Sequence, residues 1–165
     1  MNFEQIADFI LKQESDDGSG DYQPESASDP ETKWGITPED HPGKPIANIT
    51  RSDAVQILRN RYWSRIRGDD LPWPVALSLL DCIFVGGDGV RYLQRAIGVE
   101  ADGIVGPITI RAVAAVMNAE KLAYLICSMR AVHFMRTVAE NPLKAKFLDG
   151  WANRLVAVIN RIEEG

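Results

Sequence analysis

One stretch of the chain, residues 75–85, is apolar on nearly every side when it is drawn as a helix. Its sequence, VALSLLDCIFV, holds a single charged residue, Asp81. Such a helix has no polar face to turn toward water, so it is stable only when it is buried. We therefore expect a central helix here, opened by Pro74 and stopped by Gly86 and Gly87. On a helix so buried, we expect Asp81 to accept hydrogen bonds from nearby backbone groups rather than to catalyse a reaction.

Amphipathic helices account for most of the remaining chain. Apolar residues recur at three- and four-residue spacing in four further segments, residues 3–14, 54–62, 90–97 and 122–133. Typical start signals precede several helices: a capping box at residues 50–53, Asp88, the pair Gly106-Pro107, Asn118 and the pair Asn141-Pro142. The last helix runs to about residue 163. The sequence predicts an all-α fold, with room for one tiny β-hairpin near residues 22–37.

Length and hydrophobicity limit the class of protein. A chain of 165 residues with 45% hydrophobic content suits one compact domain, or one domain with a small lobe. No apolar stretch approaches the roughly 20 residues that cross a bilayer, so we expect no stable membrane insertion. The first residues, MNFEQ, have neither the basic nor the apolar region of a secretory signal. We expect the protein to be made in a cytoplasm.

The charge is acidic and unevenly distributed. The net charge is −5, and residues 1–50 hold 11 acidic but only 3 basic side chains. An acidic protein is a poor nonspecific binder of nucleic acid, because the phosphate backbone repels it. We therefore expect no nucleic-acid partner, and we expect a monomer.

The cysteines and histidines do not form a metal-binding pattern. Cys82 and Cys127 both lie in apolar, helix-patterned segments, where we expect buried free thiols. His41 and His133 each stand without a Cys partner, so no metal or other cofactor is predicted. We expect His133 to be a half-buried core residue of its helix.

Glu14 lies where the first helix meets a long polar loop. Residues 15–21 (SDDGSGD) are rich in turn formers, and the polar stretch continues to residue 31. Long ordered loops are often functional. Taken alone, however, this position is typical of an ordinary surface glutamate.

Four groups of motifs follow one another along the chain. They are Glu14 with residues 31–37 (ETKWGIT); residues 61–63 (RYW) and 70–72 (DLP) with Asp81; residues 93–99 (LQRAIGV) and 102–107 (DGIVGP) with Thr109; and residues 147–154 (FLDGWANR). In this order they resemble the phage-type lysozymes of glycoside hydrolase family 108, which carry a C-terminal predicted peptidoglycan-binding region. The resemblance covers almost the whole chain.

The resemblance implies a fold, an activity and a catalytic acid. The fold would be lysozyme-like, with a catalytic part over residues 1–85 and a helical peptidoglycan-binding part over 86–165, packed as a single compact unit. The activity would be that of an N-acetylmuramidase, which cleaves the β-1,4 bond between N-acetylmuramic acid and N-acetylglucosamine. Glu14 would protonate the leaving oxygen. The protein would be an endolysin that reaches the cell wall from the host cytoplasm after a holin opens the membrane.

Several residues are candidates for the second catalytic role and for sugar contacts. Asp29 best matches an aspartate of the family, and the hydroxyl of Thr32 can position a water molecule. Tyr22, Glu31 and Trp34 are candidates for substrate binding, with Glu31 also a candidate for the second catalytic role. Three of them have a plainer interpretation: Asp29 before Pro30 is typical of a turn, Thr32 of backbone pairing, and Trp34 of a core residue.

The chain departs from the family pattern in ways that leave a second function open. The two glycines that follow the catalytic glutamate in the family are replaced by Ser15 and Asp16, and Val85 stands where the family tends to have asparagine. These departures favour a non-catalytic, peptidoglycan-binding module of a phage tail or secretion machine. The presence of Glu14 favours the enzyme. A secreted antibacterial effector with the same chemistry is a third alternative.

Overall fold

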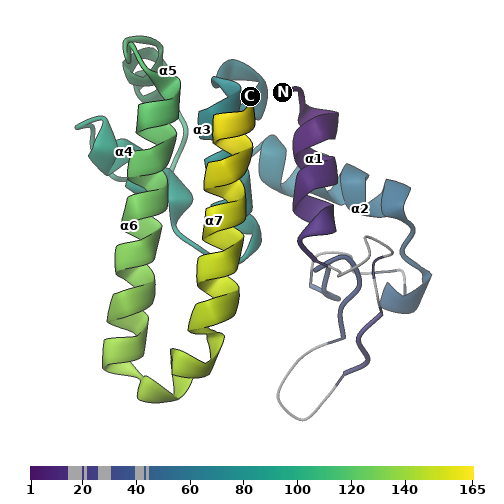
Figure 1. The fold of residues 1–165 in the computed structure, drawn as a ribbon. Helices are drawn as coiled ribbons and strands as arrows, with labels where there is room; N and C mark the ends of the chain where they lie inside the picture. The colour runs from purple at the N-terminus through teal and green to yellow at the C-terminus, as the bar shows by residue number, and fades with distance from the viewer. Residues whose placement is uncertain (15–19, 21, 26–30, 40–42, 44) are drawn as a thin grey trace. The chain divides into compact units, whose positions relative to one another are not determined.

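The computed structural model describes residues 1–14, 20, 22–25, 31–39, 43 and 45–165. These residues are mostly helical, which confirms the predicted all-α class (Figure 1). In place of a hairpin with regular strands, the described residues have two isolated antiparallel bridges, Gln23 with Thr32 and Lys33 with Ile36. The chain divides into two compact units, residues 1–64 and 65–165.

The first unit is built around helices α1 (Phe3–Lys12) and α2 (Arg51–Ile57). Each begins with a capping box: Asn2 with Gln5 starts α1, and the predicted Thr50 with Asp53 starts α2. An ion pair between Asp8 and Arg51 joins the two helices. The apolar face of α1 is buried as its periodicity predicts, through Phe3, Ile6, Ala7, Ile10 and Leu11.

The predicted helix over residues 54–62 has an unexpected second half. After α2 the chain continues as a π-helical segment, η2 (Leu58–Trp63), and the N–H of Ser64 donates to the carbonyl of Arg59 five residues earlier (3.0 Å). Such wide turns are rare, and intrinsic propensities do not signal them. The segment buries Trp63, whose ring centroid lies 5.1 Å from that of Phe3. Before α2, the short 3₁₀ helix η1 (Ile46–Asn48) adds Ile46 to the same core.

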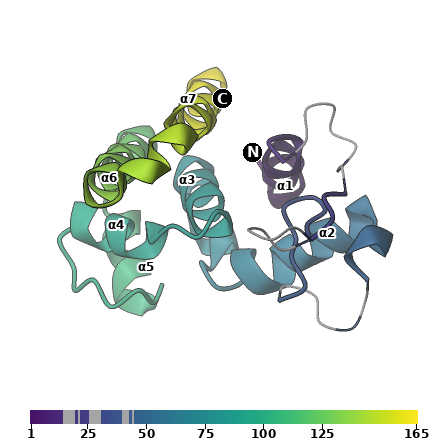
Figure 2. The same cartoon turned by 90° about the horizontal axis from the view of Figure 1, so that it is seen from below.

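The second unit packs its helices around α3 (Trp73–Phe84), which contacts α4 (Gly89–Ala96), α6 (Ala119–Glu140) and α7 (Leu148–Glu164). Figures 1 and 2 show α6 and α7 running side by side next to α3. All residues of α3 except Trp73 and Ile83 are buried, so the predicted central helix is confirmed. The remaining elements are η3 (Gly68–Asp70), α5 (Pro107–Ala114) and η4 (Pro142–Phe147).

The partners of Asp81 differ from those expected. Its side chain is fully buried and pairs with two arginines: Arg130 of α6, and Arg154 of α7 through a 2.8 Å bond from Nε. The expectation of backbone partners was wrong, because the backbone of a central helix is already paired within the helix. The carboxylate joins α3, α6 and α7 at one point.

Two further expectations for the second unit were wrong. Asp88 occupies the N-cap position of α4, but its carboxylate accepts from Arg91 (3.2 Å) instead of capping the helix. His133 is exposed on α6 rather than half-buried, because that part of the helix turns an outer face to solvent. The predicted helix starts at Gly106-Pro107 and Asn118 are confirmed, and the Asn118 side chain accepts from the N–H of Lys121 (2.6 Å).

The two cysteines are free and buried, as expected. The chain leaving α3 wraps closely around Cys82: the N–H of Gly87 donates to its carbonyl (2.8 Å), and a Cβ added to Gly87 would lie 2.6 Å from its Sγ. Burial raises the pKa of the Cys82 thiol to about 12 and also raises the pKa of Cys127. Both thiols therefore remain protonated at neutral pH.

Removing the Asp81 carboxylate is expected to destabilise the second unit strongly. Asp81→Ala leaves two arginines without their buried counter-charge, a change that typically costs about 3–5 kcal/mol. The control is Asp149→Ala, at an exposed position in the first turn of α7, which is expected to cost less than about 1 kcal/mol. Urea denaturation of both variants measures the difference, and equal costs would contradict the proposed role of Asp81.

The thiols provide an independent test of the core. At pH 8 neither Cys82 nor Cys127 should react with Ellman's reagent in the native protein, because both are buried and their pKa values are raised. In denaturant both should react at once. Rapid reaction of one thiol without denaturant would place that cysteine at the surface.

Candidate active site

Glu14 follows directly after the end of α1. The N–H of Gln13 closes the helix by donating to the carbonyls of Ile10 and Leu11, and the N–H of Glu14 donates to Leu11 (3.2 Å). The residue is half-buried. Its backbone is therefore fixed by a helix whose apolar face is anchored in the core, as positioning of a catalytic side chain requires.

The segment of residues 31–39 is held by backbone pairing and by two long side chains. Gln23 and Thr32 exchange both backbone hydrogen bonds (2.8 Å each), and Lys33 and Ile36 close the following turn. Lys33 Nζ donates to the carbonyl of Ala47 (3.0 Å), which ties this turn to η1. Farther along, Arg61 of η2 donates to the carbonyl of Glu39 (2.6 Å).

Thr32 combines the two interpretations that the sequence left open. Its backbone takes part in the bridge to Gln23, as the plainer interpretation expects. Within the described part of the chain, its hydroxyl has no hydrogen-bond partner. That hydroxyl is available to hold a water molecule or a sugar oxygen.

Tyr22 and Glu31 form a polar pair beside the same bridge. The Tyr22 hydroxyl donates to Glu31 Oε2 (2.8 Å). This hydrogen bond and the negative charge of Glu31 raise the pKa of Tyr22. Tyr22 is 41% exposed, so its ring presents an accessible aromatic surface of the kind that stacks on sugars.

Trp34 lies in the core of the first unit. It is only 5% exposed and has a left-handed backbone (φ 57°), which is uncommon for a residue other than glycine. Gly20 packs against its indole so closely that a Cβ on Gly20 would lie 2.0 Å from Cε2. The indole Nε1 is buried without a hydrogen-bond partner among the described residues. Trp34 is therefore a packing residue of the core, and its contact with a sugar remains a prediction.

The remaining candidate, Asp29, lies outside the described residues. Sequence reasoning missed the contact between Gly20 and Trp34 and the bond between Tyr22 and Glu31. The presence of a glycine within an acidic loop is only a weak signal for the contact between Gly20 and Trp34. The bond between Tyr22 and Glu31 had no signal beyond the polar character of both residues.

The candidate residues include the groups that glycoside hydrolysis uses. Glu14 supplies a carboxyl group that can act as an acid, and Glu31 and Thr32 supply a second carboxylate and a hydroxyl on one bridged segment. No group of three or more His, Cys, Asp or Glu side chains in the described ranges is arranged to hold a metal ion. Within the same ranges no helix is long and apolar enough to cross a bilayer.

Two family models match consecutive ranges of the chain. Residues 9–87 match the family model described as glycosyl hydrolase 108, and residues 88–156 match the model described as predicted peptidoglycan domain. Among solved structures, the chain is similar to that of Brucella abortus SagA, with 26% sequence identity and a TM-score of 0.80. The alignment covers 98% of this chain and 94% of the Brucella chain. No curated protein matches the chain.

The pair of Tyr22 and Glu31 can be tested by titration. Glu31→Ala removes both the hydrogen-bond acceptor and its charge, so the pKa of Tyr22 should fall toward the ordinary tyrosine value. Glu25→Ala, which removes only a weaker electrostatic influence, should lower the pKa less. NMR titration of protein with ¹³C-labelled tyrosine measures both. An unchanged pKa in Glu31→Ala would show that the pair does not form in solution.

Proposed function

We propose that the protein is an N-acetylmuramidase, because residues 9–87 match the glycosyl hydrolase 108 model and residues 88–156 match the predicted peptidoglycan domain model. The joining of a glycosidase region to a peptidoglycan region is the observation that carries the proposal. Together the two matches support a glycoside hydrolase that acts on peptidoglycan. The bond cleaved would be the β-1,4 link from N-acetylmuramic acid to N-acetylglucosamine.

Glu14 is the proposed general acid. A glycosidic bond breaks when a carboxylic acid protonates the leaving oxygen while positive charge develops on the sugar ring. Glu14 lies inside the range matched to the glycosidase family and is held at the end of an anchored helix. Its half-buried position supports this role, because a partly shielded acid retains contact with substrate while bulk water is excluded.

The second role is assigned by proposal to groups of the segment that follows. Asp29 would act as the carboxylate that stabilises the ring or activates water, and the hydroxyl of Thr32 would orient that water. Glu31 is the alternative carboxylate. Since its oxygen already accepts from Tyr22, we place the pair of Tyr22 and Glu31 in sugar binding.

The biological setting is also a proposal. We propose that the enzyme acts as an endolysin, made in the host cytoplasm and released to the wall through a holin-type pore, where it lyses the cell. The family resemblance of the motifs supports this setting. A wall-binding module of a phage tail or secretion machine is the alternative, and it predicts binding without cleavage.

Digestion of purified peptidoglycan tests the activity. Wild type should release disaccharide-peptides with reducing muramic acid ends, identified by mass spectrometry. Glu14→Gln keeps the size of the side chain but cannot donate the proton, so its rate should fall by about a hundredfold or more. Glu4→Gln, an exposed glutamate in the first turn of α1, is the matched control and should digest as wild type does.

Three results would change the assignment. If fragments end in reducing N-acetylglucosamine, the enzyme is a glycosidase of another specificity. If Glu14→Gln digests at the wild-type rate, Glu14 is not the acid. If no protein releases sugar fragments although all bind the wall, the binding-module alternative replaces the enzyme.

A further inference from the structure

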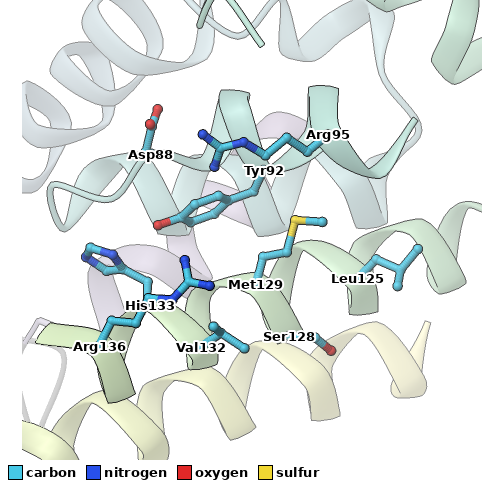
Figure 3. Close-up of a pocket in the computed structure, with 9 residues that line it drawn as sticks. All are labelled: Asp88, Tyr92, Arg95, Leu125, Ser128, Met129, Val132, His133 and Arg136. Atoms are coloured by element: carbon cyan, nitrogen blue, oxygen red, sulfur yellow. The ribbon is translucent and has the colours of Figure 1, made fainter. Parts of the chain in front are cut away.

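A groove of about 400 Å³ lies between α4 and α6, within the range matched to the peptidoglycan domain. Its apolar lining comes from Leu125, Met129 and Val132 of α6 and from the ring of Tyr92 on α4 (Figure 3). This volume falls within the range of small-ligand sites, and mixed apolar and polar walls are typical of them. Nothing in the proposed glycosidase chemistry uses this groove.

Two arginines enter the groove from opposite helices. Figure 3 shows Arg95 of α4 and Arg136 of α6 extending toward Tyr92 and His133. Neither arginine has a hydrogen-bond or ion-pair partner among the described residues. By contrast, two other arginines of this unit form ion pairs: Arg91 with Asp88, and Arg130 with Asp81. Unpaired guanidinium groups at a groove are available to bind a carboxylate.

The other polar groups of the groove fit an anionic ligand. Tyr92 is buried, and burial raises its pKa, so its hydroxyl remains a neutral donor; that hydroxyl has no partner in the described part of the structure. His133 lies beside it, with 6.3 Å between the two ring centroids. The one acid at the rim, Asp88, already accepts from Arg91. The lining therefore has an excess of positive charge.

The groove shares one lining residue with a neighbouring pocket. Leu125 also lines a second pocket of about 300 Å³, formed with Ile97, Met117 and Lys121. The side chain of Met117 is fully exposed there. Two neighbouring apolar pockets, with Arg95 and Arg136 in one and Lys121 in the other, suit an extended chain of several residues better than a single small ion.

We propose that this groove binds the short acidic peptides that peptidoglycan carries on its muramic acid, with Arg95 and Arg136 holding peptide carboxylates. The inference rests on the proposed function, since it takes peptidoglycan as the substrate. Charge complementarity selects the peptide over the glycan: backbone sugars offer hydroxyls and amides, whereas the stem peptides offer carboxylates that guanidinium groups bind in pairs. The apolar lining receives the aliphatic parts of the peptide.

Binding to intact and peptide-stripped sacculi tests the proposal. All proteins carry Glu14→Gln, so that the wall is not digested. The groove variant is Arg95→Gln with Arg136→Gln. The control is Arg111→Gln with Lys144→Gln, which removes the same charge from exposed positions outside the groove. Sedimentation gives the affinity for intact sacculi and for glycan strands freed of peptide by an amidase.

The groove variant should bind intact sacculi about tenfold more weakly than the control, as loss of charged hydrogen bonds implies. On peptide-free glycan, the groove and control variants should bind equally. A synthetic stem peptide should shift NMR signals of α4 and α6, and its fully amidated form should not.

Equal affinity of groove and control variants for intact sacculi would overturn the proposal, as would an amidated peptide that binds as well as the acidic one. Failure of the proposed activity is recorded separately, by the absence of sugar fragments with the active enzyme. The groove inference then stands or falls on the binding results alone.

Discussion

The buried carboxylate of Asp81 is the interaction on which the second unit depends. It lies on the most apolar helix of the chain and meets Arg130 and Arg154 from two other helices. A charge at such a site is tolerated only when it is paired, so α6 and α7 must dock in one register on α3. The same docking places one wall of the α4–α6 groove, because α6 carries Arg130 on its inner side and His133 and Arg136 on its outer side.

This interaction also crosses the boundary between the two family matches. Asp81 lies in the range of the glycosyl hydrolase model, whereas both arginines lie in that of the peptidoglycan domain. The packing boundary, between residues 64 and 65, falls before α3 rather than after it. Helix α3, the last helix in the range matched to the glycosyl hydrolase model, is thus the core of the second unit. Removing residues 88–165 would expose α3 and leave Asp81 without either arginine.

How much the sequence could predict depended on the range of the interactions. Uniform apolarity identified the central helix, and local caps such as Thr50 and Asn118 located helix starts. The partners of Asp81 lie 49 and 73 residues away, beyond any local pattern. The π-helical turn before Ser64 and the left-handed Trp34 are set by tertiary packing, which overrides propensity. For the site, Glu14 stood out only through the family resemblance, and the bond from Tyr22 to Glu31 had no sequence signal.

The proposed protonation of the scissile oxygen by Glu14 can be tested with a crystal structure of the Glu14→Gln protein bound to a muramic acid-containing tetrasaccharide. We expect the glycosidic oxygen to lie within hydrogen-bond reach of the side chain at position 14, with Thr32 and the pair of Tyr22 and Glu31 along the same sugar chain. The distance from position 14 to the second carboxyl group would then indicate retention or inversion. An oligosaccharide bound with its scissile bond far from position 14 would show that Glu14 is not the acid.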